Sequence, residues 1–206
     1  MERTGVNERN GGEGCADIKG LVRAESRQRL VSLLNARGFV KEESLTPEEA
    51  ARGKSRYYVG IKDAFGDPEA RLLIVGCLRE LIPAETTCTV GKGYGGAPLA
   101  DALASAPNRY RTLIGDRPDK HSDSVFVGHR LRGDGDKRDR VAIFDDVRDS
   151  GRSLKEMGDL IRSTGAELLC YIIVYDRVTG NAATIDGVPV LHVMTPEDLR
   201  QYADLP

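Results

Sequence analysis

Several features that would indicate a membrane, an export pathway or a nucleic acid are missing from this sequence. It has no apolar run approaching the roughly 20 residues that a membrane-spanning helix needs, and its first residues lack the apolar core of a signal peptide. The formal net charge of the 206 residues is −2, and no basic stripe is evident. We therefore expect a cytoplasmic protein that binds neither membranes nor nucleic acids.

Cysteine is scarce and shows no paired spacing. The chain has four cysteines, none of them in a Cys-x-x-Cys arrangement, and three lie in apolar or strand-like segments. Cysteines of this kind indicate free thiols in a reducing compartment and argue against both disulfides and a zinc site.

What the sequence does contain is a regular alternation of strand-like and helix-like segments. The strand-like ranges are 55–62, 86–90, 111–115, 141–144, 168–175 and 188–193. Helical patterns cover 26–37, 67–82, 99–105, 154 to about 165, and the residues after 195. This alternation predicts an α/β fold with a doubly wound, mainly parallel sheet and helices on both faces. Such sheets bind ligands at the C-terminal ends of their strands.

The ends of the chain and one internal stretch differ from this pattern. Residues 1–19 are rich in glycine, asparagine and charge, and we expect a flexible tail there. Residues 20–206 are expected to form a single domain, which the length of the chain permits. The range 116–140 is long and highly charged, and loops of this length are usually functional or disordered.

The segment VAIFDDVRDSGRSL, residues 141–154, carries the clearest chemical signal. Residues 149–153 should connect a strand to the N-terminus of a helix, where free backbone N–H groups and the helix dipole attract phosphate. Asp145 and Asp146 would repel a phosphate, but they could accept hydrogen bonds from a vicinal diol or hold Mg²⁺ through water. A phosphate beside a diol describes a ribose 5-phosphate. The alternative is a strand end with an aspartate cap and a solvated turn.

These residues resemble the PRPP-binding signature of the type I phosphoribosyltransferases, in which two acids precede a short Ser/Thr-Gly phosphate loop. Four other segments are similar to the orotate branch of that family and occur in the same order. They are YYVGIKDAFGDPE (57–69), which resembles its hood; GKGYGGAPLA (91–100), which resembles its glycine-rich loop; YDRVTG (175–180); and GVPVLHVMTPEDL (187–199). The resemblance covers about residues 26–200.

The resemblance implies a reaction, a cofactor and an assembly. The 5-phosphoribosyl group of PRPP would pass to orotate in a Mg²⁺-dependent reaction, giving orotidine 5′-monophosphate and pyrophosphate. The protein would be a homodimer, with hood elements near 20–65 and 187–206. A mobile loop over 116–124 would act across the dimer interface, and its charge and length suit a lid. Mg²⁺ would be held mainly by PRPP, with Asp145 or Asp146 as ligands through water.

The resemblance also implies roles for particular residues. Asp145 and Asp146 would stabilise the positive charge of an oxocarbenium-like transition state. The expelled pyrophosphate would be neutralised by loop residues, namely Arg117, Lys120 and His121. Other residues would bind substrate: Tyr94, Gly95 and Gly96 at the diphosphate; Asp149, Ser150, Gly151, Arg152 and Ser153 at the 5′-phosphate; and Arg177 at the carboxylate of orotate.

Some residues depart from the orotate pattern. The loop sequence Arg117-Pro118-Asp119-Lys120-His121 is short by one lysine. Asp149 stands where the phosphate loop usually begins with threonine, and Asp-Ser-Gly-x-Ser is more similar to the loop of 6-oxopurine phosphoribosyltransferases. At the mouth of the site Asp149 would repel a carboxylate unless it turned toward Mg²⁺ or Arg152.

These departures leave alternatives open. The chain could transfer phosphoribose to another base, such as a 6-oxopurine, or it could be a non-catalytic protein that senses PRPP. Lys120 and His121 could belong to an ordinary solvated loop. Arg177 could form an exposed pair with its neighbour Asp176.

Overall fold

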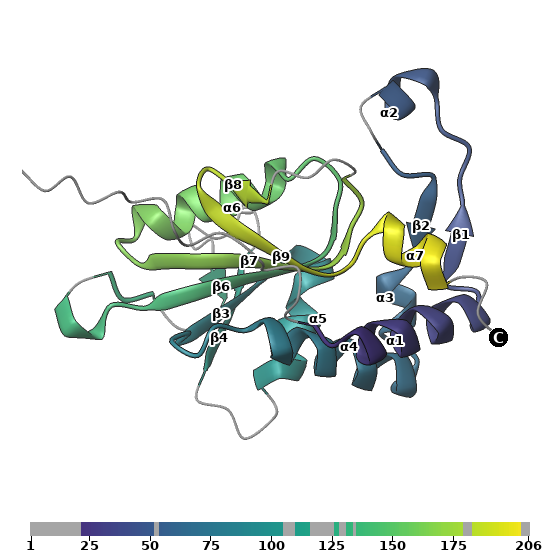
Figure 1. Cartoon of the computed structure of the whole chain (residues 1–206). Helices are drawn as coiled ribbons and strands as arrows, with labels where there is room; N and C mark the ends of the chain where they lie inside the picture. The colour runs from purple at the N-terminus through teal and green to yellow at the C-terminus, as the bar shows by residue number, and fades with distance from the viewer. Residues whose placement is uncertain are drawn as a thin grey trace, which may run out of the picture.

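The computed structural model describes residues 22–51, 54–104, 110–115, 126–127, 131–133, 135–178 and 183–202. A seven-stranded sheet with the strand order β5-β4-β3-β6-β7-β9-β8 runs through the molecule (Figure 1). Its five inner strands, from β4 to β9, are parallel, and the two edge strands β5 and β8 are antiparallel to their neighbours. The predicted α/β fold with a mainly parallel sheet is confirmed.

The strands of this sheet are β3 (Cys88–Lys92), β4 (Arg111–Gly115), β5 (Phe126–Val127), β6 (Arg140–Arg148), β7 (Glu167–Asp176), β8 (Thr184–Ile185) and β9 (Val188–Met194). The helices that pack on it are α1 (Ala24–Ala36), α4 (Pro68–Leu81), α5 (Gly93–Ala104), α6 (Arg152–Ser163) and α7 (Pro196–Tyr202). A short 3₁₀ helix covers Gly135–Lys137.

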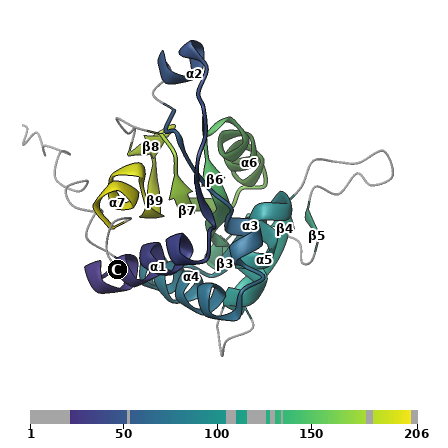
Figure 2. The same ribbon diagram turned by 90° about the vertical axis from the view of Figure 1, so that its right-hand side faces the viewer.

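The sheet is covered on both faces because its central strands are apolar on both sides (Figure 2). Successive side chains of a strand point to opposite faces. On β6, Ala142 and Phe144 pack into the core formed with α1, α4 and α5. Their neighbours Val141 and Ile143 pack into the core formed with α6. A strand buried in this way reads as a continuous apolar run, which is why β6 and β7 are evident in the sequence.

A small antiparallel hairpin lies outside the large sheet. It consists of β1 (Val40–Glu42) and β2 (Tyr57–Val59), with Lys41 opposite Tyr58. The short helix α2 (Pro47–Ala51) lies between the two strands, far from the large sheet, and α3 (Ile61–Ala64) follows β2 and leads back toward it (Figure 1). The hairpin falls within the predicted hood range 20–65. The other hood range, 187–206, includes β9, which is a strand of the large sheet. The division into one domain with a hood stays a prediction.

Helix α4 begins where the Asp67-Pro68 pair predicts. The Asp67 Oδ1 atom accepts hydrogen bonds from the backbone N–H groups of Glu69 at 2.9 Å and Ala70 at 3.0 Å. Pro68, which has no N–H to leave unpaired, occupies the first turn. These hydrogen bonds hold the pKa of Asp67 below its usual value.

Two predicted strand boundaries are wrong. Strand β6 does not end at residue 144 but continues to Arg148, so Asp145 and Asp146 lie within the strand. The neighbouring strand β7 continues with it to Asp176, which keeps the ladder of hydrogen bonds intact past the acids. The predicted strand over 55–62 shortens to β2, because helix α3 begins at Ile61.

The expectation of a glycine-rich loop in the segment 91–100 is also wrong. Strand β3 runs to Lys92, and helix α5 begins at Gly93. A Cβ atom on Gly91 would lie 2.4 Å from the Gly96 carbonyl oxygen, and one on Gly96 would lie 2.0 Å from the Phe144 carbonyl oxygen. The glycines therefore allow the start of α5 to pack directly on β3 and β6.

Other predictions from the sequence are tested only in part. The predicted tail over 1–19 and the predicted mobile loop over 116–124 lie outside the described residues. The three cysteines in the described part of the chain are free and buried, as expected for thiols without disulfides. Burial raises the pKa of Cys77 to about 11, and that of Cys88 and Cys170 to about 12. In the described residues, no helix is both long and apolar enough to cross a membrane.

The ends of β6 and β7 are joined by a buried ion pair between Arg148 and Asp176. The Arg148 Nε atom donates to Asp176 Oδ1 at 2.8 Å, and Arg148 Nη2 donates to Asp176 Oδ2. The side chains are only 4% and 0% exposed. Removing one member of such a pair leaves an uncompensated charge in a medium of low polarity.

We expect Asp176→Ala to lower the free energy of unfolding by about 3–5 kcal/mol, measured by urea denaturation of the ligand-free protein. The double variant Arg148→Met/Asp176→Leu should recover much of this loss, because it removes both charges and retains apolar volume. Glu197→Ala is the control, because it breaks an exposed pair with Arg200 and should cost no more than about 1 kcal/mol. A loss for Asp176→Ala as small as that of the control would contradict this account.

Candidate active site

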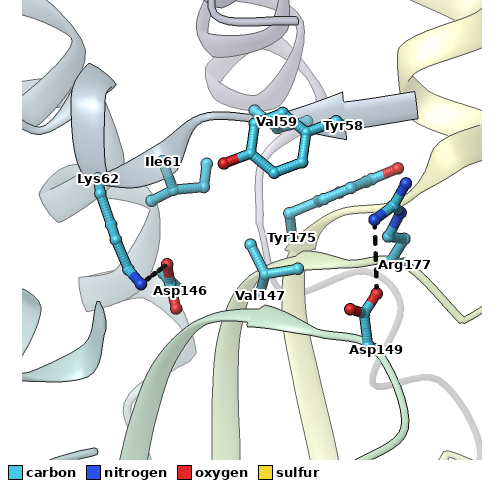
Figure 3. A pocket seen from close by; sticks show the side chains of 9 residues that line it. All are labelled: Tyr58, Val59, Ile61, Lys62, Asp146, Val147, Asp149, Tyr175 and Arg177. Carbon is cyan, nitrogen blue, oxygen red and sulfur yellow. Dashed lines mark ion pairs between the residues drawn. The ribbon is translucent and has the colours of Figure 1, made fainter. Parts of the chain in front are cut away.

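A pocket of about 200 Å³ opens at the C-terminal ends of β6 and β7, beneath the β2–α3 segment (Figure 3). Ligands bind at this edge in open parallel sheets. The lining residues come from three places: the ends of β6 and β7, the turn after β6, and the segment that runs from β2 into α3. They are Tyr58, Val59, Ile61, Lys62, Asp146, Val147, Asp149, Tyr175 and Arg177.

The two predicted catalytic acids occupy different environments because they point to opposite faces of β6. Asp146 faces the start of α5, where a Cβ atom on Gly95 would lie 2.0 Å from Asp146 Oδ1. Its carboxylate lines the pocket, 3.8 Å from the Lys62 Nζ atom (Figure 3). Asp145 is 7% exposed, and its Oδ1 atom accepts the Asp146 backbone N–H at 3.0 Å.

Burial and the neighbouring acid change the acidity of Asp145. Burial is the largest cause, and the hydrogen bond and charge of Asp146 add to it, so that the pKa of Asp145 rises from 3.8 to about 7. Burial disfavours the charged form of a carboxyl group, and a second carboxylate nearby acts in the same direction. Asp145 therefore carries a proton for part of the time near neutral pH.

The predicted phosphate turn is confirmed as a connection between a strand and a helix. Strand β6 ends at Arg148, and α6 begins at Arg152. Gly151 caps the helix with φ = 74°, a left-handed conformation that L-residues with a Cβ atom rarely adopt. Asp149 and Ser150 are exposed, and the Ser150 Oγ atom accepts the Arg152 N–H at 3.4 Å. The side chain of Arg152 pairs with Glu156, whereas Asp149 pairs with Arg177.

Arg177 is neither exposed nor paired with its neighbour Asp176, whose carboxylate binds Arg148 instead. The Arg177 side chain is 5% exposed and lines the pocket. Its Nε atom donates to the Ser55 carbonyl oxygen at 3.0 Å, and its Nη1 atom lies 3.7 Å from Asp149 Oδ1 (Figure 3). Arg177 directly follows the C-terminal end of β7, as expected, and its role toward a ligand stays a prediction. Asp149, which was expected at the same mouth of the site, faces this guanidinium.

The structure describes some of the remaining predicted residues but not others. Tyr94 is 88% exposed at the start of α5, next to the two glycines that approach β3, β6 and Asp146. Arg117, Lys120 and His121 lie outside the described residues, so their predicted roles stay predictions. Among the residues that the structure describes, no group of three or more His, Cys, Asp or Glu side chains could hold a metal ion.

Sequence reasoning missed the residues that the hairpin brings to the pocket. Lys62 lies opposite Asp146, and Glu43, the residue after β1, accepts a hydrogen bond from Arg177 Nη2 at 2.5 Å. Tyr175 donates from its hydroxyl group to the Tyr57 carbonyl oxygen at 3.1 Å, and burial raises the pKa of Tyr175 to about 12. The only available signal was the hood-like segment 57–69, which contains Lys62.

Two relatives of this chain among known proteins are both orotate phosphoribosyltransferases. No protein-family model matches it. The orotate phosphoribosyltransferase of Methanopyrus kandleri is 29% identical over 181 residues, which cover 87% of this chain and 94% of that protein. The orotate phosphoribosyltransferase of Methanosarcina mazei is 33% identical over 173 residues, which cover 81% of this chain and 89% of that protein.

Solved structures show the same fold. The orotate phosphoribosyltransferase of Mycobacterium tuberculosis H37Rv in complex with inorganic phosphate superposes with a TM-score of 0.66 at 24% identity, covering 85% of this chain and 91% of that one. The same protein in complex with PRPP gives a TM-score of 0.63 at 23% identity, covering 85% and 92%. The fold, the order of the sequence segments and the 33% identity to the Methanosarcina mazei protein agree: the chain belongs to the orotate phosphoribosyltransferase family, a branch of the type I phosphoribosyltransferases.

Proposed function

We propose that this chain catalyses the transfer of the 5-phosphoribosyl group from PRPP to orotate, which gives orotidine 5′-monophosphate and pyrophosphate. One observation carries the proposal. A single pocket at the C-terminal edge of the sheet joins Asp146, the turn that leads into α6, and the buried guanidinium of Arg177. These groups match the three parts of the reaction, namely a ribose, a phosphate and a base that bears a carboxylate.

In the proposed reaction the bond from C1 of the ribose to the pyrophosphate oxygen breaks as a ring nitrogen of the base bonds to C1. Positive charge develops on the ribose, and the carboxylate of Asp146, which lines the pocket, stabilises it. Asp145 adds to this effect only in its ionised form, because burial raises its pKa to about 7. Asp146 can also accept hydrogen bonds from the ribose hydroxyls, because its carboxylate lines the pocket. The backbone N–H groups at the start of α6 bind the 5′-phosphate.

A Mg²⁺ ion fits this chemistry. Carboxylate oxygens are the ligands it prefers, and it usually keeps several waters and binds through few carboxylates together with substrate phosphates. Asp145 and Asp146 would supply such oxygens through water, and PRPP would supply the rest. When bound, Mg²⁺ would neutralise charge on the departing pyrophosphate. Arg117, Lys120 and His121 are proposed to contribute there too.

A second candidate function is transfer to a base without a carboxylate, such as a 6-oxopurine. It is favoured by Asp149, whose Oδ1 atom lies 3.7 Å from Arg177 Nη1 and so already offers that guanidinium a counter-charge. A protein that binds PRPP without turnover is the remaining alternative. The homodimer, the action of the 116–124 loop across its interface and the cytoplasmic location stay predictions.

The first test concerns Asp146. Asp146→Asn should lower kcat/KM for PRPP by about 100-fold or more, because it removes a charge that stabilises the transition state, while the melting temperature changes little. Pyrophosphate release measures the activity. Asp159→Asn is the matched control, since Asp159 is an exposed acid on α6 that pairs with Arg162. Activity of Asp146→Asn close to that of this control would show that the acid has been assigned wrongly.

The second test concerns the base. Orotate and hypoxanthine should be offered to the wild-type protein side by side, with orotate as the better substrate. Arg177→Ala should then lower kcat/KM for orotate by about 30-fold to several thousand-fold, since losing one member of a desolvated charge pair costs about 2–5 kcal/mol. Turnover of hypoxanthine but not orotate would favour the second candidate function. Tight PRPP binding without pyrophosphate release for any base would favour the non-catalytic one.

The third test uses the raised pKa of Asp145. Because the folded protein holds this proton up to about pH 7 and the unfolded chain releases it near pH 4, protonation stabilises the fold. The ligand-free wild type should therefore lose stability relative to Asp145→Asn as the pH rises from about 4 to about 7, and the difference should level off above that. Urea denaturation at a series of pH values measures this. A difference that does not vary with pH would mean that Asp145 titrates as an ordinary surface acid.

A further inference from the structure

Glu43 connects the hairpin to the base-binding side of the pocket. It follows β1 directly, and its backbone N–H donates to the Arg56 carbonyl oxygen at 2.8 Å, which extends the pairing of the hairpin by one residue. Its Oε2 atom accepts a hydrogen bond from Arg177 Nη2 at 2.5 Å. The two residues are 134 positions apart in the chain. Their contact is therefore a tertiary one, made between the hairpin and the end of β7.

This contact occupies part of the group that should bind the base. The guanidinium of Arg177 uses its Nε atom on the Ser55 carbonyl oxygen at 3.0 Å and its Nη2 atom on Glu43. Its Nη1 atom faces Asp149 at 3.7 Å, which is an ion pair without a close hydrogen bond. Two carboxylates therefore share one guanidinium, and the formal charge of the three groups together is −1.

A carboxylate on the substrate would bind Arg177 best through two parallel hydrogen bonds. Because the Nε atom is bound to the Ser55 carbonyl oxygen, these bonds would have to come from the two terminal nitrogens. Nη1 is held loosely, whereas Nη2 is already bound to Glu43. The Glu43 side chain is 42% exposed, so it can leave Arg177 for water without an uncompensated burial of its charge. Arg177, which is 5% exposed, would then need a new anionic partner.

From these contacts we propose that Glu43 is a specificity-determining residue of the base site. It competes with the carboxylate of the base for Arg177, so a carboxylated base binds only by displacing it. Glu43 keeps the guanidinium paired in the empty site and lowers the affinity for orotate. This inference rests on the proposed function, because it assigns the carboxylate of orotate to Arg177. It adds a residue of the hairpin to the determinants of base recognition.

The test compares Glu43→Gln and Glu43→Ala with the wild type. Both variants remove the competing charge, and we expect KM and the dissociation constant for orotate to fall about 5-fold or more, because a charged hydrogen bond is roughly twice as strong as a neutral one. Uracil, which lacks the carboxylate, should bind all three proteins equally within about 2-fold. KM for PRPP should also stay within about 2-fold, since Glu43 contacts the base side of the pocket.

Glu42→Gln is the matched control. It makes the same chemical change one residue earlier, where the carboxylate is 60% exposed and lies 3.8 Å from Arg56 Nη2. This variant should bind orotate as the wild type does. Weaker or unchanged binding of orotate to both Glu43 variants would overturn the proposal, as would an equal gain for uracil or for Glu42→Gln.

Calorimetric titration with orotate separates this inference from the proposed function. If the wild type does not convert orotate, the proposed function fails. The binding constants of the Glu43 variants still decide whether Glu43 competes with a carboxylate for Arg177. If the wild type converts orotate and the variants bind it no better, the function stands and the inference is wrong.

Discussion

The pocket depends on the buried ion pair that joins the last residues of β6 and β7. Arg148 and Asp176 are bound through two hydrogen bonds between their side chains. The backbone continues the connection, because the Arg177 N–H donates to the Arg148 carbonyl oxygen at 3.0 Å. The residues that follow the pair are Asp149 and Arg177, which both line the pocket. The chain therefore enters the pocket from both strands directly after a contact whose side chains do not line the pocket.

A second level of organisation comes from the hairpin. The hairpin and α3 contact the C-terminal end of the sheet through two ion pairs. They supply the cation of one pair and the anion of the other. Lys62 offers a cation to Asp146 of the sheet, and Glu43 offers an anion to Arg177. A phosphoribosyl donor at Asp146 and a carboxylated base at Arg177 would each weaken one of these contacts. If the ligands bind in this way, occupancy of the pocket and the attachment of the hairpin would be linked through the same charges.

Much of the fold could be predicted because its signals are local. A parallel strand buried on both faces is a continuous apolar run in the sequence. The N-terminus of α4 is indicated by the pair Asp67-Pro68, a capping aspartate followed by a proline. The strand end of β6 was predicted wrongly because acids usually mark a loop, whereas here pairing with β7 continues past Asp145. The glycines around the start of α5 predict a loop because glycine favours turns. Their real role is close packing against β3 and β6, which depends on atoms more than 40 residues away, such as the Phe144 carbonyl oxygen.

The residues of the candidate site likewise fall into those that a local sequence pattern predicts and those that only tertiary contacts bring to the pocket. Asp145, Asp146 and the turn over 149–153 form one compact segment, so a local pattern was enough to find them. Lys62 lies 84 residues from its partner Asp146, and Glu43 lies 134 residues from its partner Arg177. A local sequence pattern cannot predict contacts between residues so far apart in the chain. The environment of Arg177 was missed for that reason, although the residue itself was not.

The two edge strands of the large sheet affect how copies of the protein behave at high concentration. The parallel core is bordered by β5 and β8, which are antiparallel strands of two residues each. A longer edge strand would present a row of unpaired N–H and C=O groups that could recruit a strand from another molecule. In the described residues, β5 and β8 each present such a row over only two residues. Edge strands this short leave little of their own backbone for a strand of another molecule to pair with.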